Sequence, residues 1–273
     1  MKRLTEQQLQ RFRKIIYSHF ERHGRSLPWR RTTNPYHILV SEIMLQQTQV
    51  DRVIPKYDGF IEVFPSAREL ARAPLSKVLW TWSGLGYNRR AVSLKKCAQE
   101  IMRTHKGQIP NTIKELDALP GIGCHTAGAI MAFAFNKPVV FIETNVRSVF
   151  LHHFFPKRKK VSDSELEPLI EQALDRQNPR KWYSALMDYG SVLKKEVENP
   201  SRRSKHHTKQ SRFEGSNRQL RGAILKALII RRSNTAELQR ALNRKKTELN
   251  TVLSQLQKEG LICNQEGVFG LPF

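Results

Sequence analysis

The chain has 273 residues, 47 of them Lys or Arg and 24 Asp or Glu, which gives a formal net charge of +23. This length predicts one large or two modest domains, and a hydrophobic content of 39% excludes wholesale disorder. The sequence shows no apolar run near the roughly 20 residues that span a bilayer, and no apolar N-terminal stretch typical of a signal peptide. Three scattered cysteines predict neither disulfides nor a metal site: Cys97, Cys124 and Cys263. We expect a cytoplasmic, nucleoid-associated protein.

The excess of basic residues indicates a polyanionic partner. Basic side chains are spread over the whole length, with clusters at Lys157–Lys160, Arg202–Lys209 and Arg240–Lys246. Binding to an anionic membrane usually needs a basic amphipathic helix with a strong apolar face, and this distribution does not indicate one. Nucleic acid is therefore the favoured partner, and no membrane partner is expected. The alternative is a basic protein whose charge serves only solubility.

Apolar residues recur at helical spacing along most of the chain, and no series of period-two strands is visible, so the fold class is predicted to be mainly α. Within residues 41–49 (SEIMLQQTQ), Glu42 is one carboxylate on a largely apolar helical segment. The amides of Gln46 and Gln47 follow it and are able to hydrogen-bond base edges. Such a pattern could form a site for a nucleobase, but the residues alone favour the alternative of an exposed helix charge.

Residues 119–123 (LPGIG) are the strongest local signal in the sequence. Two glycines around one apolar residue let the backbone turn sharply before the helical segment Cys124–Phe135, so that N–H groups at the helix start can hold a phosphate. With an upstream helix that ends near Ala118, this loop predicts a helix–hairpin–helix, which binds the DNA backbone independently of sequence. The alternative is an ordinary turn between two helices.

Glu143 is an isolated acid that follows the apolar residues 139–142 in a very basic protein. A half-buried carboxylate in a cationic groove can stabilise positive charge on a substrate. The alternative is an acid that the helix dipole favours at a helix N-terminus. The residues alone leave both interpretations open.

Residues 196–216 contain few apolar side chains and many cations, which predicts a flexible basic linker. The chain then carries three amphipathic segments and a hairpin turn: Arg218–Ile230, Thr235–Leu242, Lys246–Glu259 and Gln265–Gly267. Three helices followed by a hairpin are typical of a winged helix, so residues 217–273 are predicted to be a winged-helix-like domain. The third helix of such a domain enters a major groove in DNA-binding examples, and the alternative is docking to a protein.

Residues from about 12 to 195 resemble the helix–hairpin–helix (HhH-GPD) DNA glycosylase superfamily and, within it, the MutY adenine glycosylases. Five segments in family order carry the resemblance: Leu27–Arg30 (LPWR), Ser41–Val50 (SEIMLQQTQV), Trp82–Tyr87 (WSGLGY), Leu119–Ile130 (LPGIGCHTAGAI) and Met187–Gly190 (MDYG). The resemblance implies that residues 1–195 form a two-lobed helical glycosylase domain with DNA across the cleft. One lobe of six helices would span about 27–135, and the second would combine 1–26 with 136–195.

The resemblance also implies roles for individual residues. Glu42 matches the acid that protonates adenine at N7, and Glu143 matches the position of the catalytic aspartate that stabilises the oxocarbenium-like sugar and helps water reach C1′. The base or substrate pocket would contain His125, Tyr87, Gln46, Gln47 and Trp29, with the two glutamines near the estranged base and the tyrosine as a wedge beside it. The contact to the DNA backbone would come from Gly121, Ile122, Gly123 and Thr126.

The sequence departs from the family pattern at four places. Glu143 replaces an aspartate, so its carboxylate lies one methylene, about 1.5 Å, further out. His125 stands where adenine glycosylases carry Ser or Tyr and endonuclease III-like lyases carry Lys, so Schiff-base strand cleavage is not expected. The four cysteines that should follow Met187–Gly190 are absent, so no [4Fe–4S] cluster and no other cofactor or metal is expected. The C-terminus does not resemble the Nudix-like domain with which MutY proteins inspect 8-oxoguanine.

These features predict a monofunctional DNA glycosylase of base excision repair that acts as a monomer on double-stranded DNA. It would hydrolyse the N-glycosidic bond of a flipped-out adenine mispaired with 8-oxoguanine or guanine. One alternative, motivated by His125 and the altered C-terminus, is a glycosylase of the same fold that acts on thymine, uracil or another damaged base opposite guanine. The other, motivated by Glu143, is a catalytically inactive DNA-binding relative. All three would bind DNA in a manner that weakens with salt.

Overall fold

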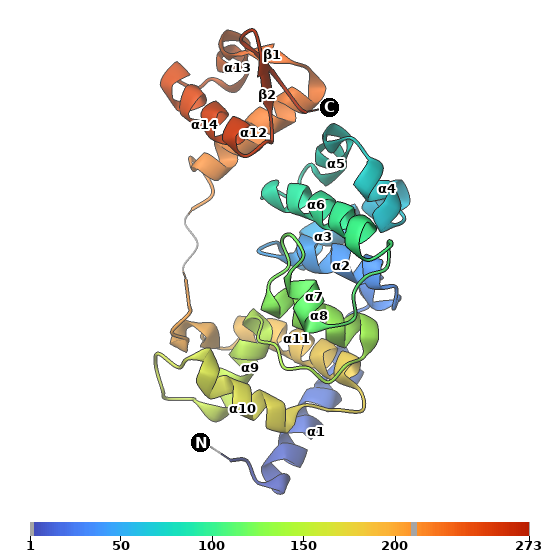
Figure 1. Cartoon of the computed structure of the whole chain (residues 1–273). Helices are drawn as coiled ribbons and strands as arrows, with labels where there is room; N and C mark the ends of the chain where they lie inside the picture. Colours follow the sequence, from blue (N-terminus) through green and yellow to red (C-terminus); the bar gives the residue numbers. More distant parts are fainter. Residues whose placement is uncertain (1–2, 209–211, 273) are drawn as a thin grey trace. The chain divides into compact units, whose positions relative to one another are not determined.

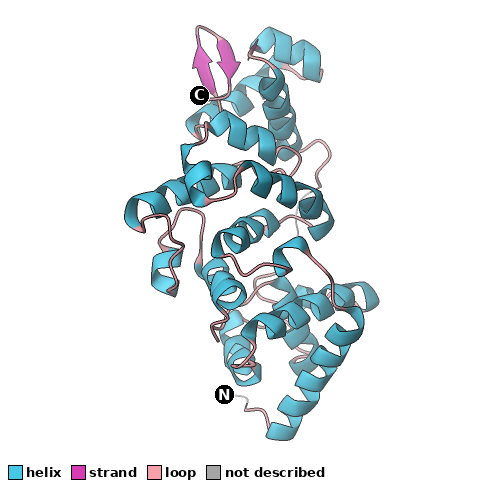
Figure 2. Cartoon of the chain, turned by 90° about the vertical axis from the view of Figure 1, so that its right-hand side faces the viewer, coloured by secondary structure: helices cyan, strands magenta, loops and turns pink. Residues whose placement is uncertain are grey.

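The computed structural model describes residues 3–208 and 212–272, and these residues are mainly helical (Figure 1; Figure 2). They form two compact units, each made from several stretches of the chain. Unit 1 contains residues 3–39, 111–118 and 122–208, and unit 2 contains residues 40–110, 119–121 and 212–272. The predicted mainly α fold class is confirmed, and the chain passes between the units several times before either is complete.

Unit 1 is a bundle of helices around a long helix near its C-terminal end. Its described helices are α1 (Glu6–His23), η1 (Pro28–Arg30), α7 (Ile113–Asp117), α8 (Cys124–Phe135), α9 (Thr144–Phe154), α10 (Asp163–Ala173), α11 (Pro179–Glu196) and η2 (Pro200–Arg203). Helix α11 packs against α1, α8 and α9. Between α1, α9 and α11, the ring of Phe12 meets those of Phe150 and Trp182 edge-on, with centroids 5.2 and 5.9 Å away. All three side chains are buried and form the core that holds α9 in place.

A buried ion cluster ties the N-terminal part of unit 1 to α11. Asp188 is 1% exposed and accepts hydrogen bonds from the Arg30 guanidinium at 2.7 and 2.8 Å and from Arg25 Nε at 2.7 Å. Burial alone would raise the pKa of Asp188, but the hydrogen bonds and charges of the two arginines outweigh burial and hold the pKa below its usual value. The segments Leu27–Arg30 and Met187–Gly190, which both carry the family resemblance, therefore meet in one structural contact.

The first part of unit 2 consists of short helices. They are α2 (Pro35–Leu45), which begins in unit 1, α3 (Val50–Val63), α4 (Ala67–Arg72), α5 (Leu75–Trp82) and α6 (Arg89–Thr104). Helix α6 packs against α4 and α5, and α3 packs against α5. The rings of Phe60 and Trp82 meet edge-on in this core. Among the described residues, no helix combines the length and apolar character needed to cross a membrane.

The second part of unit 2 is the C-terminal domain, which contains three helices and a small sheet. Its elements are α12 (Asn217–Ile230), β1 (Ser233–Asn234), α13 (Thr235–Leu242), α14 (Lys246–Lys258), β2 (Cys263–Gln265) and β3 (Val268–Gly270). The sheet is antiparallel with strand order β1-β3-β2, and Phe269 of β3 pairs with both Ser233 and Asn264. These elements follow the predicted order of three helices and a hairpin, and β1 is an addition that a two-residue strand could not reveal in the sequence.

The two compact units differ from the predicted lobes and linker. Helix α8 was expected in the lobe at 27–135, but it lies in unit 1 because it packs against α7 and α11. The predicted linker at 196–216 begins with ordered structure, because η2 packs against α9 and its neighbourhood includes buried Ser201 and Ser204. Residues 209–211 of that linker lie outside the described residues.

Candidate functional site

The predicted helix–hairpin–helix is formed by α7 and α8, which pack against each other within unit 1. Gly121 in the connecting loop has φ +82°, and a Cβ atom there would lie 2.7 Å from Ser93 Cβ, so backbone conformation and close packing both require glycine. Gly123 is the N-cap of α8 with φ −111°, and a Cβ atom there would meet no atom within 4 Å. The space beside Gly123 is therefore open where the N–H groups of a helix start favour an anion.

The turn after α2 carries the predicted pair of glutamines. Glu42 is half-buried on α2, and Gln46, just beyond the helix, donates from Nε2 to the Gly121 carbonyl oxygen at 3.3 Å. Gln47 is exposed and has φ +53°, a left-handed conformation that is uncommon for residues other than glycine. The structure thus brings the glutamine turn and the hairpin loop together within unit 2.

Arg90 fixes this turn, and sequence reasoning missed it. The residue is 9% exposed, and its guanidinium donates hydrogen bonds of 2.7 to 3.1 Å to Ile43 O, Met44 O, Thr48 Oγ1 and Gly86 O. Burial lowers the pKa of Arg90 to about 10, so the side chain still carries its charge at neutral pH. It shares one face of α6 with buried residues: Leu94, Cys97, Ala98 and Ile101. An arginine in an apolar helical stripe is the signal that could have found it.

Tyr87 lies close to two guanidinium groups. It is 36% exposed and has φ +45°. The guanidinium carbons of Arg90 and Arg218 lie 5.6 and 5.9 Å from its ring centroid, and Arg218 Nη1 donates to its hydroxyl oxygen at 2.7 Å. Because Arg218 belongs to α12, the C-terminal domain contacts the residue that is predicted to act as a wedge.

A second contact joins the C-terminal domain to α6. Glu259 follows α14 and accepts hydrogen bonds from Arg89 of α6, at 2.5 Å, and from Arg221 of α12. The hydrogen bond from Arg89 is the largest cause of the low pKa of Glu259, about 2, and Arg221 adds to it while burial opposes both. Neither contact has a local sequence signal, because the partners are far apart along the chain.

Glu143 is the N-cap residue of α9. Its Oε1 accepts the backbone N–H groups of Asn145 and Val146 at 2.7 and 2.9 Å, and its Oε2 accepts the Asn145 side-chain amide at 3.2 Å. Shorter capping side chains make the same two backbone contacts, so the extra methylene of the glutamate is taken up within the capping turn. The carboxylate is half-buried at the positive end of the helix dipole, as the second interpretation of the sequence expected. Oε2 can still accept a further hydrogen bond from a reacting group, because a carboxylate oxygen can accept more than one.

The remaining predicted residues divide between surface and core. His125 is exposed and Thr126 half-buried in the first turn of α8, and Ile122 is 6% exposed. Trp29 is 5% exposed within η1, so its ring packs in the core of unit 1. Unit 2 contains Glu42, Gln46, Gln47, Tyr87 and Gly121, whereas unit 1 contains Glu143, His125, Thr126, Ile122, Gly123 and Trp29.

The residues after α11 do not fit an iron–sulfur cluster. Such a cluster needs cysteine thiolates, and positions 191–208 contain none. Within the described ranges, no group of three or more His, Cys, Asp and Glu side chains could hold a metal ion. Of the cysteines elsewhere, Cys97 is buried, which raises the pKa of its thiol to about 12 and makes it a poor ligand.

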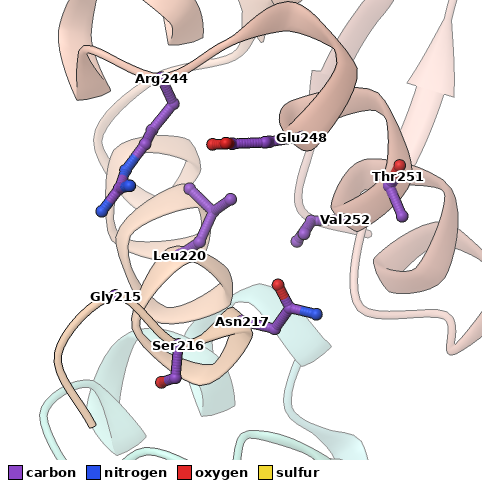
Figure 3. Close-up of a pocket in the computed structure, with 8 residues that line it drawn as sticks. All are labelled: Gly215, Ser216, Asn217, Leu220, Arg244, Glu248, Thr251 and Val252. Atoms are coloured by element: carbon purple, nitrogen blue, oxygen red, sulfur yellow. The ribbon is translucent and has the colours of Figure 1, made fainter.

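A cavity of about 290 Å³ lies within the C-terminal domain, between the start of α12 and the start of α14 (Figure 3). It is lined by Gly215, Ser216, Asn217, Leu220, Arg244, Glu248, Thr251 and Val252. Figure 3 shows Arg244 and Glu248 on one side of the cavity and Ser216 and Asn217 on the other. None of the predicted site residues lines this cavity.

A family model described as HhH-GPD superfamily base excision DNA repair protein matches residues 40–174. These residues are an HhH-GPD domain. The domain includes the hairpin, both candidate carboxylates and all of α10, and its assignment confirms the family that the sequence motifs indicated.

The HhH-GPD domain and its flanks are similar to adenine DNA glycosylases. The chain is 38% identical over 181 residues to that of Buchnera aphidicola subsp. Baizongia pistaciae, covering 65% of this chain and 50% of the relative. It is 43% identical over 135 residues to that of Mycolicibacterium smegmatis, covering 49% and 46%. It is 34% identical over 195 residues to that of Homo sapiens, covering 67% and 36%. The chain thus spans about half or less of these relatives.

Solved structures share the fold. A thermostable thymine-DNA glycosylase has a TM-score of 0.61 and 25% identity, covering 70% of this chain and 91% of that one. A trapped endonuclease III–DNA covalent intermediate in an estranged-adenine complex has a TM-score of 0.59 and 20% identity, covering 70% and 88%. At that identity the second likeness concerns the fold alone.

Proposed function

We propose that this protein is a monofunctional DNA N-glycosylase of base excision repair that removes adenine from a mispair with 8-oxoguanine or guanine. The observation that carries the proposal is the Glu143 carboxylate, which three donors hold at the start of α9 in a domain similar to adenine DNA glycosylases. A fixed, half-buried carboxylate is suited to stabilise positive charge that develops on a sugar.

In the proposed reaction, the target nucleotide leaves the duplex because its glycosidic bond cannot be attacked within the base stack. Glu42 protonates adenine at N7 and makes the base a better leaving group. Glu143 stabilises the oxocarbenium-like sugar and helps water reach C1′, so that one acid and one counter-charge divide the work as in glycoside hydrolysis. His125 supplies no amine for a Schiff base, so the strand is left uncut.

The proposed DNA contacts come from backbone groups and from three side chains. The open hairpin around Gly123 binds a phosphate, while Gln46, Gln47 and Tyr87 occupy the space near the estranged base. The net charge of +23 supplies the general attraction to DNA. The protein acts as a monomer without an iron–sulfur cluster.

A second candidate is a glycosylase that removes thymine or uracil opposite guanine. Two observations favour it: the exposed His125 at the start of α8, and the similarity in fold to a thymine-DNA glycosylase. An imidazole beside the hairpin can hydrogen-bond the edge of a pyrimidine as readily as that of a purine.

A single-turnover assay tests both candidates on four labelled duplexes, with A opposite 8-oxoguanine, A opposite G, T opposite G and U opposite G, each developed with alkali. Strand breaks at adenine are expected. The Glu143→Gln variant should lose at least about 100-fold in rate with little change in duplex affinity. Breaks only at T or U would select the second candidate, and tight binding without breaks would identify an inactive DNA-binding relative. Iron measured in the same preparation should be far below one cluster per chain.

A further inference from the structure

A chain of contacts links α11 to the carboxylate of Glu143. Lys194 Nζ, near the end of α11, donates to Asn145 Oδ1 at 2.8 Å, and Asn145 Nδ2 donates to Glu143 Oε2 at 3.2 Å. The ammonium group can only donate and the carboxylate can only accept, so a flipped amide would lose both hydrogen bonds. The two charged groups therefore fix which way the Asn145 amide points.

Lys194 differs from its neighbour in its surroundings. Lys194 is half-buried, and burial lowers the pKa of its ammonium group while the negative charge of Glu143 opposes that change. Lys195 is exposed, with no such contact among the described residues. A lysine that gives up hydration beside an acid is held there by interaction with it, whereas a solvated lysine is free to move.

The residues that follow α11 support the same turn from behind. Ser201 Oγ lies 2.6 Å from Ser148 Oγ, and Ser148 donates to the Thr144 carbonyl oxygen at 2.7 Å in the first turn of α9. Gly190 of α11 approaches so closely that a Cβ atom there would lie 2.6 Å from the Asn145 carbonyl oxygen. These contacts leave the first turn of α9 little room to shift.

We propose that Lys194 is a positioning residue for Glu143, and that it acts through the side-chain amide of Asn145. This inference rests on the proposed function of Glu143. The inference also gives a function to the segment in which the family resemblance predicts cluster cysteines. In this chain, polar side chains of that segment, and not a metal cluster, stabilise the start of α9.

The test compares Lys194→Met with Lys195→Met, which removes the adjacent exposed charge from the same helix. Lys194→Met should lower the single-turnover rate of base release by about 10- to 100-fold, because small misplacements of a reacting group cost that much, while duplex affinity changes as little as in Lys195→Met. Lys195→Met should keep the wild-type rate. If Lys194→Met lowers the unfolding temperature markedly, Lys194→Gln is compared with it: because glutamine retains a donor for Asn145 Oδ1, it should recover much of the lost rate.

Two further measurements separate positioning from general stability and from the proposed activity. In an Asn145→Ala background, Lys194→Met should cause no further loss of rate, because both act through the same amide. Hydrogen exchange of the Val146 amide, which donates to Glu143, should be faster in Lys194→Met than in Lys195→Met. Equal exchange and equal rates in the two variants, or additive losses in the double variant, would overturn the inference. If the wild type proves inactive but the Val146 amide still exchanges faster in Lys194→Met than in Lys195→Met, only the proposed function is rejected.

Discussion

The backbone segments at Glu42 and Glu143 are held by different groups: a positively charged side chain holds the first, and a negatively charged one holds the second. Around residues 43–48, backbone carbonyl groups converge on the buried guanidinium of Arg90. At 143–146, backbone N–H groups converge on a carboxylate from the same turn. The first arrangement depends on a side chain more than 40 residues away, and the second largely on its own helix. We infer that the glutamine turn is the more vulnerable of the two to a single substitution.

The strongest test of this contrast is Arg90→Met. It would leave four oxygen acceptors without their donor in a buried place, and we expect a loss of about 3–5 kcal/mol in the free energy of unfolding, measured with urea. Glu143→Gln keeps an amide oxygen to accept both backbone N–H groups, so its expected loss is at most about 1 kcal/mol. Lys96→Met removes an exposed cation from the same helix and serves as the control. Equal losses in Arg90→Met and Glu143→Gln would contradict the comparison.

Gly121→Ala tests how much the hairpin loop, to which the glutamine turn is hydrogen-bonded, contributes to stability. The left-handed φ and the approach of Ser93 predict a cost of about 1–3 kcal/mol in unfolding free energy. Gly123→Ala, whose added methyl meets no neighbour, should cost much less but weaken duplex binding by obstructing the open helix start. Thermal unfolding and a duplex titration measure the two effects. The same cost at both glycines would mean that Ser93 and the backbone conformation matter little.

Lowering the pH should destabilise the α9 segment, whereas Arg90 keeps its charge and its hydrogen bonds in acid. Burial lowers the pKa of His153 on α9 from 6.5 to about 4, so the folded protein binds fewer protons than the unfolded chain between these values. The contribution to stability is complete above pH 6.5 and is lost as the pH falls toward 4, with a size on the order of 1 kcal/mol after allowance for partial exposure. His153→Phe keeps the ring contacts but gives up the hydrogen bond between His153 Nε2 and the Tyr189 hydroxyl (3.1 Å). It should make the urea midpoint depend less on pH over this range, while the exposed His207→Gln should not. If the urea midpoint of His153→Phe depended on pH as strongly as that of the wild type, another group would be responsible for the pH dependence.

The sequence predicted those parts of the fold whose signals are local. The three C-terminal helices were predicted to within one residue at each end, because Ser216 and Asn234 cap amphipathic segments. The hairpin was recognisable from its two glycines, and Glu143 from its place before a helix. The dipole interpretation and the chemical interpretation of Glu143 turn out to describe the same geometry, so the sequence could not have chosen between them.

The sequence missed residues whose partners are distant along the chain. Lys194 and Arg218 each look like one more solvated cation in a chain with 47 basic residues, and Arg90 is marked only by the apolar helical stripe in which it stands. Only the folded structure shows that they contact the glutamine turn, Asn145 and Tyr87. The start of the predicted linker was missed for the opposite reason: Ser201 looks polar and exposed, but its hydroxyl is satisfied by Ser148 and is therefore buried without penalty.

The placement of α1 has a consequence for how the protein is made. Its contacts come from residues synthesised much later: Leu4 N–H donates to Gln172, and Arg13 to the Ala173 carbonyl oxygen, across 168 and 160 positions. At about 5–20 residues per second, the nascent helix waits on the order of 10–30 s for these partners. During that time an 18-residue amphipathic segment is marginally stable alone and keeps its apolar face uncovered. Helix α1 is thus synthesised well before the residues that secure it.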